Sequence, residues 1–431
     1  MFGFGLQCYL WSSEGALEHQ PGELPAVAWT PRDGLLPTVS ADLPAAPGPL
    51  LRLTVRGQRT LVCAPDQQLY TADGWRAARL LTPDDSVALV RWLPGPTLSR
   101  ANRYARWIGW MMGNGCYSTG APSFTSGDAD VRVAFAAATS ILFGFLPRHE
   151  LRPNGNIQLT ITRPQAAGGG TGPNPVKEYL KAHGFWGTRG PDKSLPRAWA
   201  ADLDDTSLIE WVAGVWDTDG SVSVGADRRV QISYGSVSER LAWQILWALD
   251  RLGVHAGMYR TTETHRAPNG VHYQYTPDRP FNIVDIGHSA EMEHFRRTVT
   301  LTGRRQATLD TLPAPPEVAA EVSNVPRWAA SRLREYARDL CIPAHRIGFH
   351  DHKKRLGQHR LESVLDCLRD TAQAEGRAVT EDPVLRALCD PSILWRPVRE
   401  VVPVEPGPRY ARTTPERTIV IDGFIASASP E

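Results

Sequence analysis

Side chains that can hydrogen-bond to the edges of DNA bases alternate with apolar residues along two predicted strands. Gln158 and Thr160 share one face of the first strand, and Arg229 and Gln231 share one face of the second. Such side chains read base edges in the major groove, which is wide enough for a two-stranded β-ribbon. The same alternation is typical of an ordinary sheet with one solvated face, so it is compatible with DNA recognition but does not establish it.

A third hairpin is predicted further along the chain. Residues 259–262 and 271–275 flank Pro268–Gly270, which is a turn signal. We predict that these two segments pair and that Arg260 joins the same polar surface.

Two apolar segments that end in Asn114 and Asp219 must position these strands. Residues 103–115 and 209–220 form a weak internal repeat, and each has a helical pattern that stops at a glycine. Small residues on one side of each segment would let two helix backbones pack closely; these residues are Gly109, Gly113, Gly214 and Thr218. We predict two helices side by side, with Asn114 and Asp219 together at their C-terminal ends.

The second apolar segment resembles a known motif. Val212–Gly220 resembles the LAGLIDADG motif of homing endonucleases, and Trp107–Gly115 resembles its first copy. In that family the last acidic residue of each motif holds a divalent metal, Mg²⁺ or Mn²⁺, which supports hydrolysis of a DNA phosphodiester. The resemblance assigns catalysis and metal binding to Asp219 and, in the first copy, to Asn114. The neutral amide of Asn114 is a poorer Mg²⁺ ligand, so we predict loss of double-strand cutting and survival of nicking or of binding alone.

The same resemblance gives roles to two basic residues. The family has a lysine upstream of the second motif, which Lys193 matches, and another near the end of the second repeat, where this chain has Arg305. Lys193 would assist proton transfer or stabilise charge. Arg305 would contact phosphate, because arginine keeps its charge but does not readily shuttle protons. The alternatives are a solvated surface lysine and simple drift in an arginine-rich chain.

The two ends of the chain resemble the conserved blocks of inteins. Arg59–Leu89 resembles the second block, and Trp395 together with Thr418–Ile425 resembles the C-terminal blocks. The whole layout is similar to inteins of replicative DNA helicases. The resemblance implies a β-rich Hint domain that is built from both ends and interrupted by the endonuclease.

Most residues that splicing needs are replaced. Cys8 is the candidate nucleophile, with a buried structural thiol as the alternative. Ala64 and Gln67 stand at the Thr-x-x-His positions of the family. Ser427 and Ala428 stand at the positions of the penultimate His and the terminal Asn, and Ser429 follows as the first extein residue. Without an imidazole at position 67 or an amide at position 428, the residues argue against completed splicing. An active intein that uses other residues is the alternative.

A basic stretch lies between the endonuclease and the C-terminal block. Residues 327–360 hold nine Lys and Arg residues against three Asp and Glu residues, and the basic set includes Lys353, Lys354 and Arg355. We predict that this helical segment contacts DNA phosphates through counterion release. A solvated charged face is the alternative. Cys341 and four nearby histidines do not match a standard zinc spacing.

Composition bounds these predictions only loosely. The chain has 47 Lys and Arg residues against 46 Asp and Glu residues, a formal net charge of +1, which argues against a uniformly basic nucleic-acid binder but averages over domains. Its six cysteines include no CxxC pair, so we expect a reduced, cytoplasmic setting. The most apolar run, residues 133–146, is too short to cross a bilayer and predicts a buried helix.

We therefore predict an α+β protein in four parts. These parts are the two halves of the Hint domain (1–98 and 391–431), a pseudo-twofold αββαββ endonuclease domain (99–312) and a helical, basic, DNA-contacting segment (313–390). We expect a monomer that acts on a long double-stranded DNA site and not on a membrane. A self-splicing intein and a catalytically dead DNA-binding remnant are the alternative functions.

Overall fold

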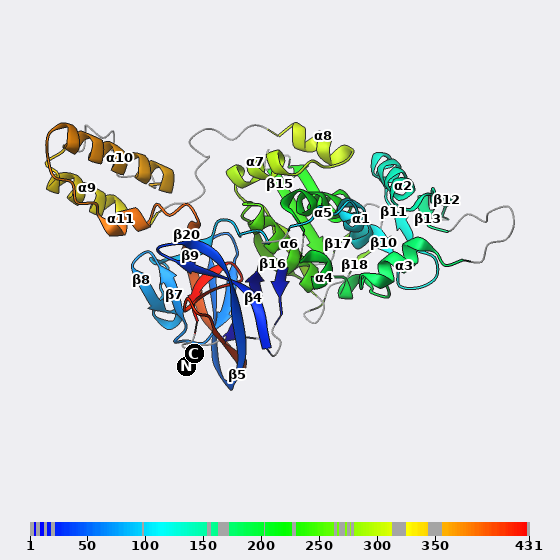
Figure 1. The fold of residues 1–431 in the computed structure, drawn as a ribbon, viewed down its shortest axis with the longest axis horizontal. Coiled ribbons are helices and arrows are strands. Elements are labelled where there is room, and N and C mark those ends of the chain that lie inside the picture. The colour runs from blue at the N-terminus through cyan, green and yellow to red at the C-terminus, as the bar shows by residue number, and fades with distance from the viewer. Residues whose placement is uncertain are drawn as a thin grey trace.

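A computed structural model describes most of the chain. The described residues are 4–5, 9–12, 15–18, 22–96, 99–152, 157–162, 172–201, 203–225, 230–262, 265–266, 272–273, 276, 280–312, 325–343 and 356–428. They form a β-rich body, a mixed helix-and-sheet body beside it and a small helical unit (Figure 1). The predicted α+β fold class is confirmed.

The β-rich body is one twelve-stranded sheet built from both ends of the chain. The strand β5 (Gly34–Val55) pairs antiparallel with β20 (Ile393–Thr413) over most of their length. Near the C-terminus, β22 (Phe424–Ser427) pairs with β7 (Gln68–Thr71) and β9 (Ser86–Val90). The other members are β1 (Phe4–Gly5), β2 (Leu10–Ser12), β3 (Gly15–Leu17), β4 (Gly22–Thr30), β6 (Thr60–Cys63), β8 (Gly74–Ala77) and β21 (Thr418–Ile421), with a 3₁₀ turn at Ala78–Leu80.

The mixed body consists of two repeats, each with its own four-stranded sheet. The first repeat contains α1 (Ala105–Asn114), β10 (Gly115–Cys116), β11 (Ser123–Thr125), α2 (Ala129–Phe143), β12 (Arg148–Leu151), β13 (Ile157–Thr160) and α3 (Pro175–Ala182). The second contains α5 (Asp205–Asp219), β14 (Gly220–Val224), β15 (Val230–Ser236), α6 (Glu239–Arg251), β16 (Gly257–Thr261), β19 (Phe281–Asp285) and α7 (Ser289–Thr298). Shorter elements are a 3₁₀ turn (Gly190–Asp192), α4 (Arg197–Ala200), β17 (His265–Arg266), β18 (His272–Tyr273) and α8 (Arg304–Asp310).

The predicted third hairpin is confirmed only in part. Among the described residues, β17 pairs with β18, one on each side of the predicted turn, whereas β16 pairs with β19. The reason is tertiary: β19 buries Asn282 and Val284, so the core selects it as the neighbour of β16. A turn signal by itself fixes only the local hairpin.

The apolar run at 133–146 is helical mainly within α2, but its burial is one-sided. Phe135 and Ala136 are buried, whereas the side chains of Val133 and Ile141 are 68% and 79% exposed. The expected buried helix is therefore wrong for one face. Among the described helices, none has the length and apolar character needed to cross a membrane.

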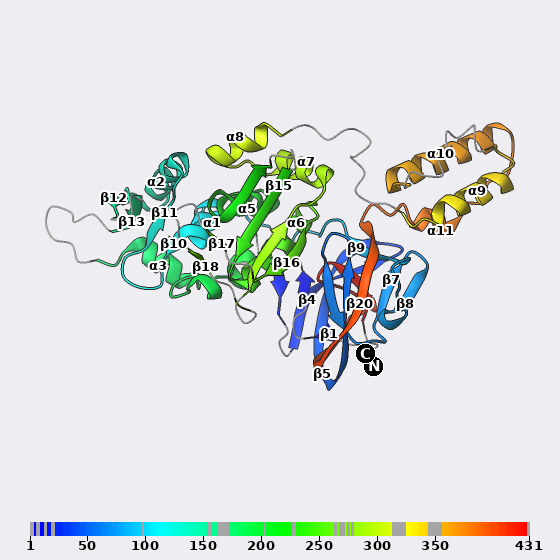
Figure 2. The same ribbon diagram turned by 180° about the vertical axis from the view of Figure 1, so that it is seen from behind.

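Three helices form the small unit, which lies apart from the two repeats in both views (Figures 1 and 2). They are α9 (Ala329–Asp339), α10 (Gln358–Ala374) and α11 (Pro383–Ala387). The unit leads directly into β20 at Ile393.

Candidate active site

The site is organised by the crossing of α1 and α5. A Cβ atom added at Gly109 would lie 2.5 Å from the carbonyl oxygen of Trp211, and one added at Gly214 would lie 2.3 Å from that of Arg106. Both distances are shorter than any side-chain contact allows, so glycine at each position lets the backbones touch. The predicted close packing of the two helices is confirmed.

Both helices end at the same place in the fold. α1 ends at Asn114 and α5 ends at Asp219, each followed by a glycine in an extended conformation. A Cβ atom at Gly113 would lie 3.4 Å from Oδ2 of Asp219, so this carboxylate lies beside the last turn of α1. Asn114 is exposed at that turn.

Lys193 closes the C-terminal end of α1. Its Nζ atom donates to the carbonyl oxygens of Gly113 (2.8 Å), Gly115 (2.9 Å) and Met111 (3.4 Å). Carbonyl groups at the C-terminal end of a helix lack intrahelical partners and lie in the negative potential of the helix dipole, although the Met111 carbonyl also accepts from the N–H of Gly115. Lys193 is therefore a buried cap and not a solvated surface residue.

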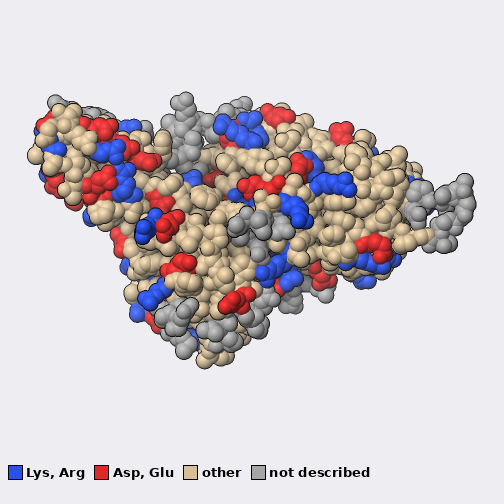
Figure 3. Space-filling view, viewed as in Figure 1, with Lys and Arg blue, Asp and Glu red and all other residues tan. Residues whose placement is uncertain are grey.

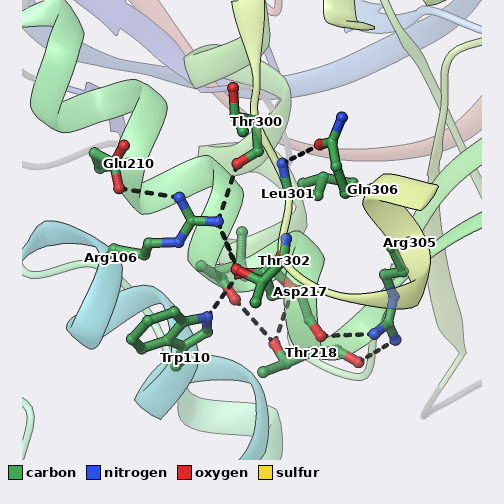
Figure 4. A network of polar contacts seen from close by, with 12 residues as sticks. Arg106, Trp110, Glu210, Asp217, Thr218, Thr300, Leu301, Thr302, Arg305 and Gln306 are labelled. Atoms are coloured by element: carbon green, nitrogen blue, oxygen red, sulfur yellow. Dashed lines mark hydrogen bonds and ion pairs between the residues drawn. The ribbon is translucent and has the colours of Figure 1, made fainter. Parts of the chain in front are cut away.

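Arg305 closes α5 in the corresponding way (Figure 4). Its guanidinium donates to the carbonyl oxygens of Asp217 (2.6 Å), Thr218 (2.7 Å) and Gly220 (2.7 Å). Lys193 and Arg305 thus each follow a repeat in the sequence and contact the first helix of that repeat. Three of the five guanidinium N–H groups are used in this way, which leaves two for a further acceptor.

The close packing of the two helix ends shifts the pKa values of Asp219 and Lys193. The packed helix ends remove water from Asp219 and raise the pKa of its carboxyl group to about 6, against the opposing effects of Lys193 and Arg305. The side chain keeps an exposed surface, so solvent offsets part of this rise and the carboxylate is open to a ligand. Burial lowers the pKa of Lys193 to about 8, and the nearby Asp219 opposes that change.

A second network fixes the segment that carries Arg305, and the sequence did not predict it (Figure 4). The buried carboxylate of Asp217 accepts from Arg106 (3.0 Å), from Trp110 Nε1 (2.8 Å) and from the backbone N–H of Thr302 (2.6 Å). Arg106 also pairs with Glu210 on α5 at 3.2 Å. One feature of the sequence could have revealed this network. The first repeat has the apolar Met112 at the position that matches Asp217, so only the second repeat has a carboxylate there.

The donor set at the helix ends fits a single divalent ion. Within the described residues, no group of three or more His, Cys, Asp or Glu side chains is arranged to hold a metal. Mg²⁺ is often bound by only one or two carboxylates, with waters and substrate phosphates as its other ligands. The carboxylate of Asp219 meets that minimal requirement.

Comparison with known proteins identifies the second repeat. Residues 207–300, from α5 to the end of α7, match the family model of the LAGLIDADG-like domain. This stretch is a LAGLIDADG-like domain. The match begins within α5, the helix that carries Asp219.

Longer matches extend beyond the LAGLIDADG-like domain. The replicative DNA helicase DnaB of Rhodothermus marinus is 27% identical over 217 residues, which cover 48% of this chain and 22% of the helicase. The RecA protein of Mycobacterium tuberculosis is 24% identical over 402 residues, which cover 87% of this chain and 48% of RecA. The chain thus spans less than half the length of either relative. The matches confirm the resemblance to helicase-type inteins that carry a LAGLIDADG endonuclease.

Solved structures give weaker global similarity. A DnaB intein from Synechocystis matches 21% of this chain and 70% of its own, with 14% sequence identity and a TM-score of 0.20. Variants of the homing endonuclease I-DmoI match 51% of this chain and 97% of their own, with 12% identity and a TM-score of 0.30.

In the LAGLIDADG-like domain, strand register places one predicted DNA-binding residue on the wrong face. Gln231 of β15 shares a face with Ser233, which lies opposite Asp285. Arg260 lies opposite Asn282, on the other face, and pairs with Glu239 of α6. Arg260 therefore does not join the face of Gln231, because side chains an odd number of residues apart point to opposite faces, and its contact with DNA stays a prediction. Arg229 lies outside the described residues.

The first sheet places its two candidate residues together. Gln158 and Thr160 share a face of β13, and Gln158 Nε2 donates to Thr160 Oγ1 at 3.3 Å. Leu159 points to the core and is fully buried. Arg152 donates to Gln158 Oε1 at 2.7 Å, so this face also holds positive charge.

The splicing positions that the structure describes lie close together in the β-rich body. Gln67 is fully buried, and its Nε2 donates to the carbonyl oxygen of Ser427 at 2.8 Å and to its hydroxyl at 3.2 Å. Ala64 and Ala428 are also buried. Cys8 and Ser429 lie outside the described residues.

The helical unit is less basic than the stretch 327–360 suggests. Residues 313–390 contain 12 Lys and Arg residues and 12 Asp and Glu residues. Ion pairs join the two sets, for example Arg332 with Asp382 (2.7 Å) and Arg386 with Glu381 (2.8 Å). Figure 3 shows both charges intermixed on this unit. Lys353, Lys354 and Arg355 lie outside the described residues.

Proposed function

We propose that this protein is a site-specific endonuclease that binds a long double-stranded DNA site and nicks one strand. The observation that carries the proposal is the unequal pair of helix ends. α5 offers the carboxylate of Asp219, whereas α1 offers only the amide of Asn114 at the matching position. Cutting both strands requires two competent half-sites, so one competent half-site supports a single cut.

The residues around Asp219 have distinct roles in this proposal. A bound Mg²⁺ or Mn²⁺ would supply Lewis-acid assistance to phosphodiester hydrolysis, with Asp219 as its carboxylate ligand. Lys193 has a pKa lowered to about 8, so a fraction of it is neutral near physiological pH and able to accept a proton. Arg305 positions the end of α5 and directs its two remaining N–H groups to phosphate.

The polar sheet faces supply the DNA contacts. Gln158 in the first repeat and Gln231 in the second lie on the face opposite the fully buried Leu159 and Ile232, and Thr160 shares the face of Gln158 but is itself buried. A protein that neutralises several phosphates binds DNA with an affinity that falls steeply with salt. Binding is therefore expected to weaken strongly between low and physiological ionic strength.

A nicking assay tests the enzymatic part. We would incubate the protein and Mg²⁺ with a supercoiled plasmid library that contains helicase and RecA gene segments, and follow nicked and linear products on a gel. The wild type is expected to nick, Asp219→Asn to lose nicking by at least 100-fold, and Asn114→Asp to gain linear product. Efficient linearisation by the wild type contradicts the proposal. Equal DNA binding by wild type and Asp219→Asn with no nicking by either identifies a DNA-binding remnant.

We also propose that the protein does not complete splicing. The support is that Gln67 and Ser427 occupy adjoining positions at which the family has two histidines, and neither side chain can act as a general acid or base near neutral pH. Ala428 has no amide to cyclise. A fusion of the chain between two reporter proteins is expected to stay intact on a denaturing gel, and a ligated reporter product would restore the self-splicing alternative.

A further inference from the structure

An interdomain cavity of about 420 Å³ lies where the β-rich body meets the second repeat. The hairpin at 56–58 and the start of β20 form one wall, and the end of β19 with the loop to α7 forms the other. The two walls pack closely, because a Cβ atom added at Gly257 would lie 1.9 Å from the carbonyl oxygen of Gly57. The cavity is remote in sequence from both motif helices and has no part in the proposed cleavage.

The charged lining of the cavity is mainly positive. Arg56, Arg396 and Arg399 line it together with a single carboxylate, Asp285, which leaves a net charge of +2 when the histidines are neutral. Arg56 and Arg399 are exposed at its mouth. Within the part of the chain that the structure describes, neither of these two side chains makes a hydrogen bond or an ion pair. Arginine guanidinium groups match the geometry of phosphate oxygens.

A buried histidine faces the same space. His255 is 5% exposed, lines the cavity, and has no hydrogen-bond partner for either ring nitrogen among the described residues. The Asp250 carboxylate is 3.7 Å from Nδ1 and already pairs with Arg59 at 2.6 Å, and the Glu291 carboxylate accepts from the backbone N–H of His255 at 2.8 Å. A buried polar group without a partner costs free energy, and a ligand in the cavity would remove that cost.

The electrostatic field at His255 has the sign that attracts an anion. Burial lowers the pKa of His255 well below its usual value, and Arg396, Arg59 and Arg91 lower it further. The ring is therefore neutral near pH 7 and has one N–H to donate. His288, which also lines the cavity, has a pKa lowered by burial and by Arg396.

We propose that this cavity binds a small oxyanion of the phosphate class, held by Arg56 and Arg399 at the mouth and by a ring N–H of His255 inside. A dianion balances the net charge of the lining. The volume lies within the range of small-molecule sites, roughly 300–1,000 Å³, so a phosphomonoester fits as well as inorganic phosphate. Either a free small molecule or the DNA backbone could supply the phosphate group. The experiment distinguishes these two sources.

Titration calorimetry with the full chain tests the proposal. Inorganic phosphate is added at pH 7.5 and constant ionic strength set by chloride, and one saturable site is expected. Arg399→Gln is expected to weaken phosphate binding by about tenfold, the usual effect of removing a charge-assisted hydrogen bond, and Arg56→Gln by a similar factor. Arg32→Gln is the matched control, because Arg32 is a highly exposed arginine of the same body that does not line the cavity.

Three outcomes decide the question. Saturable binding that both cavity variants weaken and the control does not, in proteins with unchanged circular dichroism spectra, supports the site. No saturable binding of phosphate, or equal binding by all variants, overturns it. A short DNA duplex without terminal phosphates provides the last arm: if Arg399→Gln weakens duplex binding while phosphate neither binds nor competes, the cavity serves the DNA backbone and the free-anion proposal fails.

Discussion

At the residue scale, the basic residues of the site are held by backbone carbonyls. Lys193 and Arg305 each donate to three carbonyl oxygens at a helix end. Arginine at position 305 has a structural role here, since its planar fork donates to three backbone acceptors. The same contacts tie the last segment of the repeat to its first helix.

Arg305→Ala should destabilise the protein by about 3 kcal/mol. The substitution leaves the carbonyl oxygens of Asp217, Thr218 and Gly220 without their donor, and each such loss costs ~1–3 kcal/mol, with less than additive effect. Urea unfolding followed by circular dichroism measures the change. Arg304→Ala is the control, because the neighbouring Arg304 side chain is 75% exposed and should cost less than about 0.5 kcal/mol. Equal losses in the two variants would contradict a capping role for Arg305.

At the element scale, the contact between α1 and α5 places the two motif ends together. This contact depends on glycine where the backbones cross, and the sheets that follow each helix inherit their orientation from it. The polar sheet faces and the helix ends are therefore coupled through one packing interface. A change at the crossing should disturb DNA binding even though no DNA contact is altered.

Gly214→Ala should destabilise the protein by about 3 kcal/mol or more, because its methyl group would overlap the carbonyl oxygen of Arg106 and the helices cannot separate without exposing their core. Thermal unfolding and DNA binding measure the effect. The matched control is Gly127→Ala, since an added Cβ atom there meets nothing within 4 Å. A Gly214→Ala protein with the stability of the control would show that the crossing is loose.

At the scale of the whole molecule, the β-rich body and the second repeat are joined through their cores. The ion pair between Arg59 and Asp250 is almost completely buried at this junction, and Trp247 Nε1 donates to the backbone oxygen of Ser12 at 2.8 Å. Because a buried charge without its partner is costly, neither body is expected to keep its stability when separated from the other.

The junction should also make stability sensitive to acid through His255. Its pKa lies well below the usual value in the folded protein, so as pH falls through the usual histidine range the unfolded chain binds a proton there before the folded protein does. The free energy of unfolding therefore falls as pH falls, by about 1 kcal/mol per pH unit from this group. Burial raises the pKa of Asp250 to about 7, so protonation of Asp250 stabilises the folded protein as pH falls. This opposing effect is present both in the wild type and in a His255→Asn variant.

Urea unfolding of the wild type and of His255→Asn at several pH values isolates this contribution. The variant should lose less stability than the wild type from pH 6.5 to 5, and the difference between the two slopes should be about 1 kcal/mol per pH unit. Parallel pH profiles would show that His255 is protonated in the folded state. Saturating phosphate should raise the stability of the wild type if the interdomain cavity binds it.

The sequence by itself determined the chemistry available at each position and the local periodicity. The predicted motif copies, the alternation of Gln158 and Thr160, and the absence of His and Asn at positions 67 and 428 all follow from residue identity and spacing. These features depend on neighbours a few residues away, so short-range rules capture them. The domain boundaries and the catalytic roles of the site residues remain predictions.

Only the tertiary structure decided which groups meet. The pairing of β5 with β20, the capping contacts of Lys193 and Arg305, and the face on which Arg260 lies depend on residues up to several hundred positions apart. The cavity around His255 is likewise assembled from both bodies. Such contacts are fixed by the competition of all segments for one core, and because that competition is non-local, a pattern within any single segment cannot reveal its result.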